Sequence, residues 1–188
     1  MPRLDINYGF SKKPDIQEAV REASIQARSK STSAKIDFCL ALFNFDLDNA
    51  KQLPYIVKEV LNPASVIGFS LPYLIAQDQV FKRGIIIITI SGVQIINQVV
   101  SSGRDISTTS EKLVWKLLRA AQGERRAALV TFSDLSLSTA AGFLQGINRG
   151  FGKNSSYFGI FNCREQLTSF LLYNDTLLTD SSIGMLIP

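Results

Sequence analysis

Acidic side chains follow two apolar runs of the chain, at places where they could bind a ligand or do chemistry. Asp46 and Asp48 come after the apolar segment 35–43, and Asp134 comes after segment 127–132. In open α/β structures the carboxyl ends of parallel strands frame the ligand crevice, which favours polar contacts from these residues. Asp and Ser between a strand and a helix are also ordinary cap and turn residues. A binding role and a capping role therefore both stay open for these positions.

Histidine is absent from the 188 residues, and this absence limits the available chemistry. It removes Ser/His and Cys/His pairs, histidine-ligated haem and the common zinc sites, and the two cysteines, Cys39 and Cys163, are too few for a thiolate zinc site. We expect a binding domain without a cofactor, and not an enzyme. The alternative is a hydrolase or transferase that depends on a carboxylate or a cysteine and uses Asp46, Asp134 or Cys163.

Two segments of the chain repeat one design, "ASVIGFSLPYL" at 64–74 and "SSYFGIFNCRE" at 155–165. Each has an apolar run, then a glycine, then a phenylalanine and a small polar residue. A glycine there permits a bulge or the close approach of another backbone. It would also let a ligand approach the main chain and leave N–H groups free for a carboxylate, so Gly68 and Gly159 are candidate anion contacts. Neither segment has the glycines of a dinucleotide or phosphate loop.

The periodicity of apolar residues predicts the elements that hold these segments. Helices are expected after Pro14, over 54–61, from a capping box at Thr108 and Glu111 to about 123, and over 138–149 with a cap at Gly150. Strands are expected over 35–43, 64–70, 84–91, 127–132, 155–163 and 168–174, with segment 93–100 pairing beside 84–91.

Both halves of the chain read helix, strand, helix, strand, strand, strand, which indicates a duplication. We predict a single α/β domain over 1–188, with pseudo-repeat halves of about 11–102 and 103–188. Each half contributes a mixed sheet flanked by helices, and the layers are expected to stack as α-β-β-α.

Composition narrows the classes of partner. The chain is 46% hydrophobic and 19% charged, as in ordinary globular proteins, and its net charge of +4 comes from scattered doublets such as Lys82 and Arg83. We therefore expect no nucleic-acid partner. The longest apolar stretch, 84–100, is interrupted by polar residues and is too short to span a membrane easily. A cytoplasmic location without membrane association is expected, since the N-terminus has no signal sequence.

The order of the segments "IDFCLALFNF", "NPASVIGFS", "IIIITISG", "AALVTFSD", "GINRGFG", "YFGIFN" and "IGMLIP" resembles the N-terminal FIST domain, the sensory family named for F-box and intracellular signal transduction. The resemblance covers nearly all of the chain. It implies a domain that binds an amino acid or another small polar metabolite in signal transduction. Its implied partners are a C-terminal FIST domain, absent from this sequence, or a signalling output domain. The family's small-residue, acidic segment after the first glycine is replaced here by "LPYLI" at 71–75, which leaves the ligand open.

The ligand is expected between the two halves, next to the repeated glycine segments. Gly68 and Gly159 would supply backbone contacts to an anion, and polar and aromatic side chains would orient the ligand. The candidate ligand-binding residues are Asn44, Gly68, Phe69, Ser70, Tyr73, Asp134, Gly159, Phe161 and Asn162.

Overall fold

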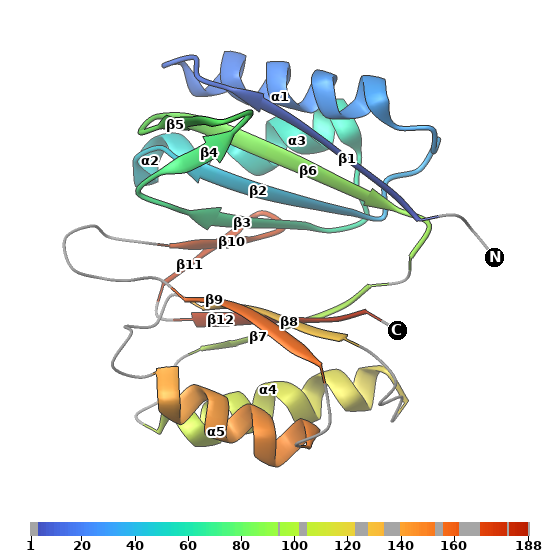
Figure 1. Cartoon of the computed structure of the whole chain (residues 1–188), viewed down its shortest axis with the longest axis vertical. Coiled ribbons are helices and arrows are strands. Elements are labelled where there is room, and N and C mark those ends of the chain that lie inside the picture. The colour runs from blue at the N-terminus through green and yellow to red at the C-terminus, as the bar shows by residue number, and fades with distance from the viewer. Residues whose placement is uncertain are drawn as a thin grey trace. The chain divides into compact units, whose positions relative to one another are not determined.

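The computed structural model describes residues 4–93, 95–101, 105–122, 128–133, 140–152, 156–161, 170–179 and 181–187. The chain divides into two compact units, drawn in Figure 1. Unit 1 holds Met1–Val93 and Leu172–Leu177, and unit 2 holds Gln94–Leu171 and Leu178–Pro188. Within the described ranges, each helix is too short or too polar to span a membrane.

Unit 1 is built on a six-stranded sheet in the order β1-β6-β2-β3-β10-β11. The strands are β1 (Asp5–Ser11), β2 (Phe38–Asn44), β3 (Val66–Ser70), β6 (Gly84–Ser91), β10 (Leu171–Tyr173) and β11 (Thr176–Leu178). β6 is antiparallel to both β1 and β2, whereas β2 and β3 are parallel. The remaining elements are the helices α1 (Ile16–Lys30), α2 (Leu47–Ala50) and α3 (Leu53–Leu61), and a separate hairpin of β4 (Leu74–Ala76) and β5 (Gln79–Phe81).

Unit 2 is built on a four-stranded sheet in the order β7-β12-β8-β9. Its strands are β7 (Ile96–Ser101), β8 (Ala128–Ser133), β9 (Tyr157–Phe161) and β12 (Ser181–Ile187), and its helices are α4 (Ile106–Ala120) and α5 (Ala140–Phe151). β12 is antiparallel to β7 and β8, and β8 and β9 are parallel. These are the strand directions of β1-β6-β2-β3, so the two sheets share one topology.

Equivalent hydrogen bonds fix which residues correspond between the two sheets. Cys39 N donates to Ser65 O, and Leu129 N donates to Ser156 O, at the start of each parallel pair. Counting along the strands from these bonds makes Gly159 the counterpart of Gly68. The predicted fold class, a mixed α/β protein of two pseudo-repeated halves with helices flanking the sheets, is confirmed.

Each repeat begins one strand earlier than the sequence pattern indicated. β1 precedes α1 in the first repeat, and β7 precedes α4 in the second. The expected pairing of segment 93–100 beside 84–91 is wrong, because β7 pairs with β12 in the sheet of unit 2. A strand that opens the second repeat satisfies its backbone in its own sheet, although it directly follows β6 in the sequence.

Helix α1 covers the sheet of unit 1 and packs against β1, β6 and α3 (Figure 1). Its start after Pro14 is as predicted, because Asp15 caps the helix by accepting from Glu18 N at 2.9 Å. One stripe of small and branched side chains is buried: Ile16, Ala19, Val20, Ala23 and Ala27. This three- and four-residue spacing presents a continuous apolar face to the sheet.

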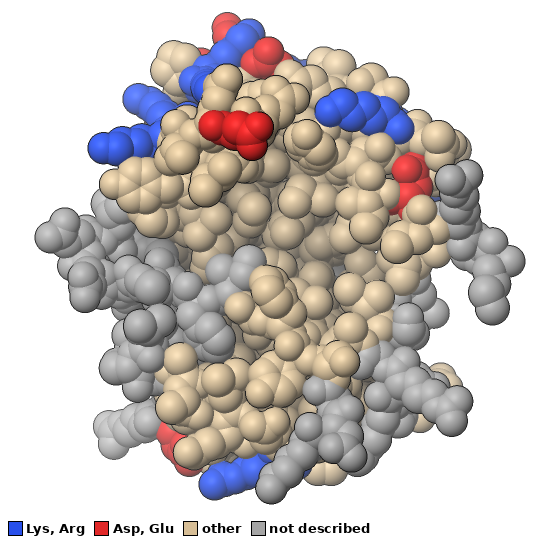
Figure 2. Space-filling view, in the orientation of Figure 1, with Lys and Arg blue, Asp and Glu red and all other residues tan. Residues whose placement is uncertain are grey.

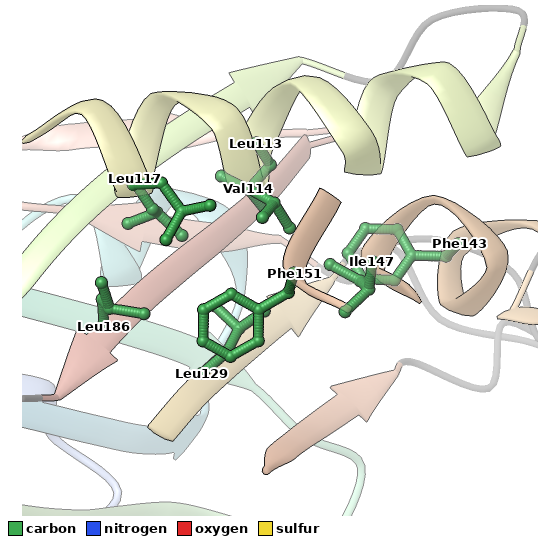
Figure 3. Close-up of a cluster of buried hydrophobic side chains, with 9 residues drawn as sticks. Leu113, Val114, Leu117, Leu129, Phe143, Ile147, Phe151 and Leu186 are labelled. Atoms are coloured by element: carbon green, nitrogen blue, oxygen red, sulfur yellow. The ribbon is translucent and has the colours of Figure 1, made fainter. Parts of the chain in front are cut away.

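The core of unit 2 lies between its two helices and one face of its sheet. Figure 3 shows leucine and valine side chains of α4 pointing toward Phe151 of α5 and toward strand residues Leu129 and Leu186. The buried members of this cluster are Leu113, Val114, Leu117, Leu118, Leu129, Phe143, Ile147, Phe151 and Leu186. Each such side chain contributes about 1.5 to 3 kcal/mol when fully buried.

Two predicted helix ends are wrong. Asp105 caps α4, because its carboxylate accepts from Ser107 N and Thr108 N at 3.0 and 3.2 Å, so Thr108 lies inside the helix and does not open a capping box. Gly150 lies within α5, where a Cβ would come 2.8 Å from Val114 Cβ. Its small size permits close helix packing, and the left-handed residue past the helix is Gly152, with φ +97°.

Candidate functional site

The carboxyl ends of three strands in unit 1 meet at one edge of the sheet. The cross-strand register places four residues in one row: Ser11, Ile85, Phe43 and Ser70. The chain leaves β1, β2 and β3 just beyond this row, and β6 begins there. We call the residues at and beyond the row, namely 11–12, 43–44, 70–73 and 82–85, the carboxyl edge of unit 1.

Asn44 fastens the loop that follows β3 to the end of β2. Its side-chain amide Nδ2 donates to Pro72 O at 2.7 Å, and Leu71 N donates to Phe43 O at 2.8 Å. These bonds fix the backbone of residues 71–72 beside the strand end. Tyr73, the next residue, is therefore held at the same edge, with 54% of its surface exposed.

One lysine lies beside this aromatic side chain, and another lies at the same edge. The ammonium of Lys82 lies 5.6 Å from the centre of the Tyr73 ring, within the range of a cation–π contact. Lys12 follows β1 at the same edge, and its ammonium lies 5.3 Å from the ring centre of Phe81. In the sequence, Lys82 and Arg83 form one of several scattered charged doublets. Both residues directly precede β6, and the start of a strand lies beside the carboxyl ends of its antiparallel neighbours. This position was the signal in the sequence that could have placed them at the carboxyl edge.

Of the predicted ligand-binding residues, Asn44, Ser70 and Tyr73 come together at the carboxyl edge of unit 1. Ser70 is 9% exposed. Phe69 is fully buried in the core and does not form a wall at the surface. In unit 2, Phe161 ends β9 opposite Ser133. Asp134, Asn162 and the side chain of Phe161 lie outside the described residues.

Neither Gly68 nor Gly159 forms a bulge, because the strand registers run through both glycines without interruption. Both glycines are the central residues of straight strands, β3 and β9, and neither has a positive φ. A Cβ on Gly68 would lie 2.8 Å from Leu172 Cβ and 3.0 Å from Phe43 Cε1. The reason for a glycine at position 68 is therefore the close approach of a neighbouring strand, not a turn with free N–H groups.

The carboxylate considered for catalysis after the first strand has a structural role. Asp46 caps α2 by accepting from Asn49 N at 2.9 Å and from Asn49 Nδ2 at 2.7 Å. These bonds, together with the nearby charge of Arg83, lower the pKa of Asp46. Such a carboxylate stays ionised and is a poor proton donor at neutral pH.

The cysteine in β2 is inert. Cys39 is fully buried, and burial raises the pKa of its thiol to about 12. A thiol with this pKa is neither a nucleophile nor a metal ligand at neutral pH. Cys163, the other cysteine, lies outside the described residues. Within the residues that the structure places, no three Cys, Asp or Glu side chains gather closely enough to hold a metal ion.

Unit 2 places two hydroxyl groups together near the carboxyl end of β8. The Oγ atoms of Ser133 and Ser182 are 2.5 Å apart, and both residues are fully buried. The register pairs these residues directly across β8 and β12. Their counterparts in unit 1 are Phe43 and Ile85, so the two repeats differ in polarity at this position.

No family model matches the chain, and no curated protein matches it. Among solved structures, the chain is similar to a cyanuric acid hydrolase from A. caulinodans, with a TM-score of 0.48 and 10% identity over 98% of this chain and 71% of that one. A second cyanuric acid hydrolase, described as an evolutionary innovation by structural concatenation, has a TM-score of 0.48 and 9% identity, over 100% of this chain and 69% of that one.

These similarities correct one expectation. The expectation that the chain is not an enzyme is corrected, because the solved structures that the chain resembles are enzymes. At 9–10% identity the likeness concerns the fold and assigns no substrate or residue role. The resemblance to the FIST family, with its sensory role, stays a prediction.

Proposed function

We propose that the chain binds a small polar anion, an amino acid or another small carboxylate, at the carboxyl edge of unit 1. One observation carries the proposal: the sheet register brings the ends of β1, β2 and β3 together with Asn44, Tyr73 and Lys82. Ligands of α/β sheets bind outside the carboxyl ends of the strands, which is the location of these side chains.

Charge at this edge suits a carboxylate. Lys82 and Arg83 are adjacent in the chain, and Lys12 directly follows Ser11, the residue of β1 in the row. The nearby Asp46 carboxylate already accepts hydrogen bonds from Asn49. Figure 2 shows the Lys, Arg, Asp and Glu side chains on one face of the molecule, with broad uncharged surface between them. A cation next to the exposed Tyr73 ring favours a ligand that has both a negative charge and apolar atoms.

Each group at the edge has a distinct role in the proposal. The Lys82 ammonium and the Arg83 guanidinium attract the carboxylate, and the guanidinium can bind it through two parallel hydrogen bonds. The exposed Tyr73 ring packs against the apolar part of the ligand. Asn44 positions the loop through its bond to Pro72 O and keeps its side-chain oxygen as an acceptor.

A thermal-shift screen of the amino acids and of small carboxylates tests the proposal. A ligand at about 100 times its Kd should stabilise the fold by about 2.7 kcal/mol and raise Tm by roughly 5 to 10 °C. The variant K82Q/R83Q should lose this shift because it lacks the attracting charges. Lys35→Gln is the matched control, since Lys35 is an exposed cation that precedes β2 at its opposite end. An unchanged shift in K82Q/R83Q, or no shift with any compound, overturns the proposal.

Hydrolysis is a second candidate, and the observation that favours it is the hydroxyl pair of unit 2. Ser133 and Ser182 meet near the end of β8, and a serine hydroxyl that a neighbouring base activates can serve acyl transfer. Turnover of generic ester and amide substrates, and of cyanuric acid, tests this candidate. The hydrolase candidate is supported if Ser133→Ala or Asp134→Asn abolishes the activity. Loss of activity in Cys163→Ala also supports it and assigns the reaction to the thiol. Activity that survives all three substitutions, or no turnover of any substrate, contradicts it.

A further inference from the structure

Strand β3 is extended by a hairpin that comes from far along the chain. β10 lies next to β3 in the sheet of unit 1, and β11 follows it. Asn174, in the turn of this β10–β11 hairpin, donates from its backbone N to Val66 O at 2.8 Å and accepts from Val66 N through its Oδ1 at 3.1 Å. Leu172 lies over Gly68, where a Cβ would clash with it, and is only 1% exposed.

Strand β9 has the position in unit 2 that β3 has in unit 1, but it is the last strand of its sheet among those described. Two of its side chains are exposed, Tyr157 to 41% and Phe158 to 63%. Leu129 N donates to Ser156 O, so the backbone groups of 156 and 158 face β8. By the alternation of strand hydrogen bonds, those of Tyr157 and Gly159 face outward, as those of Val66 and Gly68 face β10.

A second hairpin with the design of β10–β11 exists in the first repeat and joins neither of the larger sheets. β4 and β5 form a two-stranded sheet of three residues each, as in β10–β11, joined by a turn at Gln77 and Asp78. Gln77 has a left-handed backbone with φ +49°, as its counterpart Asn174 has with φ +54°, whereas the second turn residue is left-handed at Asp78, with φ +61°, and not at Asp175. One face of this β4–β5 hairpin is buried in a cluster with Leu74 and Phe81.

The other face of the β4–β5 hairpin is apolar and exposed. Ile75 and Val80 are cross-strand partners there, with 69% and 65% of their surfaces exposed. Ile75 is the counterpart of Leu172, which is buried against β3. The same hairpin position is therefore covered in one repeat and open in the other, while no hairpin of the described residues extends β9 as β10–β11 extends β3.

We propose that β4 of one copy of this chain adds to the open edge of β9 in a second copy. Ile75 would lie over Gly159 as Leu172 lies over Gly68. Gln77 would pair with the outward-facing backbone of Tyr157 as Asn174 pairs with that of Val66. Strand addition of this kind gains backbone hydrogen bonds at an exposed edge, and the side chains that fit determine which strand binds.

The proposed contact joins two different surfaces, so it is heterologous. Each copy has one donor hairpin, β4–β5, and one acceptor edge, β9, and copies can therefore associate head to tail into rings or chains. A three-residue strand makes a small interface, so association is weak and is expected at protein concentrations from roughly 0.1 to 1 mM.

Sedimentation and light scattering of the full chain over this concentration range test the proposal. Ile75→Lys removes the donor, and Tyr157→Pro removes the outward N–H of the acceptor without touching the backbone groups that face β8. Each variant alone should remain at the 20.8 kDa of one chain. Tyr55→Lys is the matched control, because Tyr55 lies on α3 with 65% exposure and belongs to neither surface. It should associate like the unmodified chain.

Mixing the two variants gives the decisive measurement. Ile75→Lys retains an intact β9 and Tyr157→Pro retains an intact β4, so an equimolar mixture should form a species of twice the mass of one chain and grow no further. Circular dichroism confirms that each variant is folded, and Gly159→Val serves as the acceptor variant if Tyr157→Pro is not. A monomeric unmodified chain at 1 mM, a monomeric mixture of folded variants, or loss of association in Tyr55→Lys overturns the proposal.

Discussion

At the scale of single residues, two polar groups of unit 1 differ in how well they are satisfied. Asp5 accepts hydrogen bonds from Ser31 Oγ at 2.9 Å, Asn7 Nδ2 at 2.7 Å and Thr32 N at 2.9 Å. Ser24, on α1, is fully buried, and its hydroxyl has no hydrogen-bond partner among the described residues. The Asp5 carboxylate should make the stability of the fold depend on pH, and the unpaired Ser24 hydroxyl should lower that stability.

Ser24→Ala should raise the free energy of unfolding by about 1 kcal/mol, because it removes a buried unpaired hydroxyl and improves helix propensity. Ser29→Ala in the same helix is the control, since Ser29 is exposed and bonds to Gln26 O. It should change stability by less than about 0.5 kcal/mol. Urea unfolding of both variants measures the difference, and a Ser24→Ala protein less stable than the unmodified chain would contradict the structure.

Asp5 should stabilise the fold only where its carboxylate is ionised. The hydrogen bonds from Ser31 and Asn7, with those from the backbone at Thr32 and Ser33, lower its pKa from 3.8 to about 2. Because the folded-state pKa is the lower one, the stabilisation is complete above about pH 4 to 5 and is lost as pH falls toward 2. The difference in unfolding free energy between the unmodified chain and Asp5→Asn should therefore shrink over this range. An equal difference at pH 2 and pH 6 would rule out this role.

At the scale of elements, the sequence predicted most helices and strands but left several reasons open for a repeated glycine. The apolar stripes of α1 and α4 and the branched run of β6 were sufficient, because burial on one face leaves a clear period. Strand β1 was missed although Ile6, Tyr8 and Phe10 alternate with other residues, since two of these side chains are more than 40% exposed and the alternation is weak.

The candidate site was predictable only in part. Asn44 and Tyr73 follow strand ends in the sequence, so their location at a sheet edge could be inferred. Lys82 lies at the same edge as Asn44 and Tyr73 because β6 is antiparallel to β2. Pairing between strands far apart in the sequence leaves no local signal. The approach of β10 to Gly68 spans more than a hundred residues, so the sequence indicated a possible close approach at this glycine but not the strand that makes it.

Gly68→Ala should destabilise the chain by about 1 to 3 kcal/mol, because its Cβ overpacks the junction with Leu172. In a Leu172→Gly background, which removes the Cβ and Cδ1 that the added Cβ would meet, the same substitution should cost less than half as much. Gly142→Ala in α5 should have the opposite sign and stabilise by roughly 0.5 to 1 kcal/mol, since the nearest atom to its Cβ lies 4.0 Å away. Denaturant titrations measure these free energies of unfolding. If Gly68→Ala cost the same in both backgrounds, overpacking against Leu172 would be excluded as the cause.

At the scale of the whole molecule, one topology occurs twice, but only one of the two hairpins, β10–β11, joins a larger sheet. The β10–β11 hairpin lies between β9 and β12 in the sequence, yet it completes the sheet of unit 1. A substitution in its turn should therefore act on β3, although the two segments are separated by about a hundred residues. In the described part of a single copy, the β4–β5 hairpin makes no bond to β3 like those of Asn174 with Val66. Substitutions in the turn of β4–β5 therefore serve as a control for substitutions in the turn of β10–β11.

Asn174→Gly keeps the left-handed turn but removes the Oδ1 that accepts from Val66 N. The loss of about 1 kcal/mol for one hydrogen bond should speed amide exchange at Val66 roughly fivefold. Gln77→Gly makes the same change at the matching turn position and should leave Val66 unaffected in dilute, monomeric protein. Exchange followed by NMR or mass spectrometry at 10 μM or below separates this effect from self-association. If both variants raised exchange at Val66 equally, the cause would be turn flexibility and not the bond between β10 and β3.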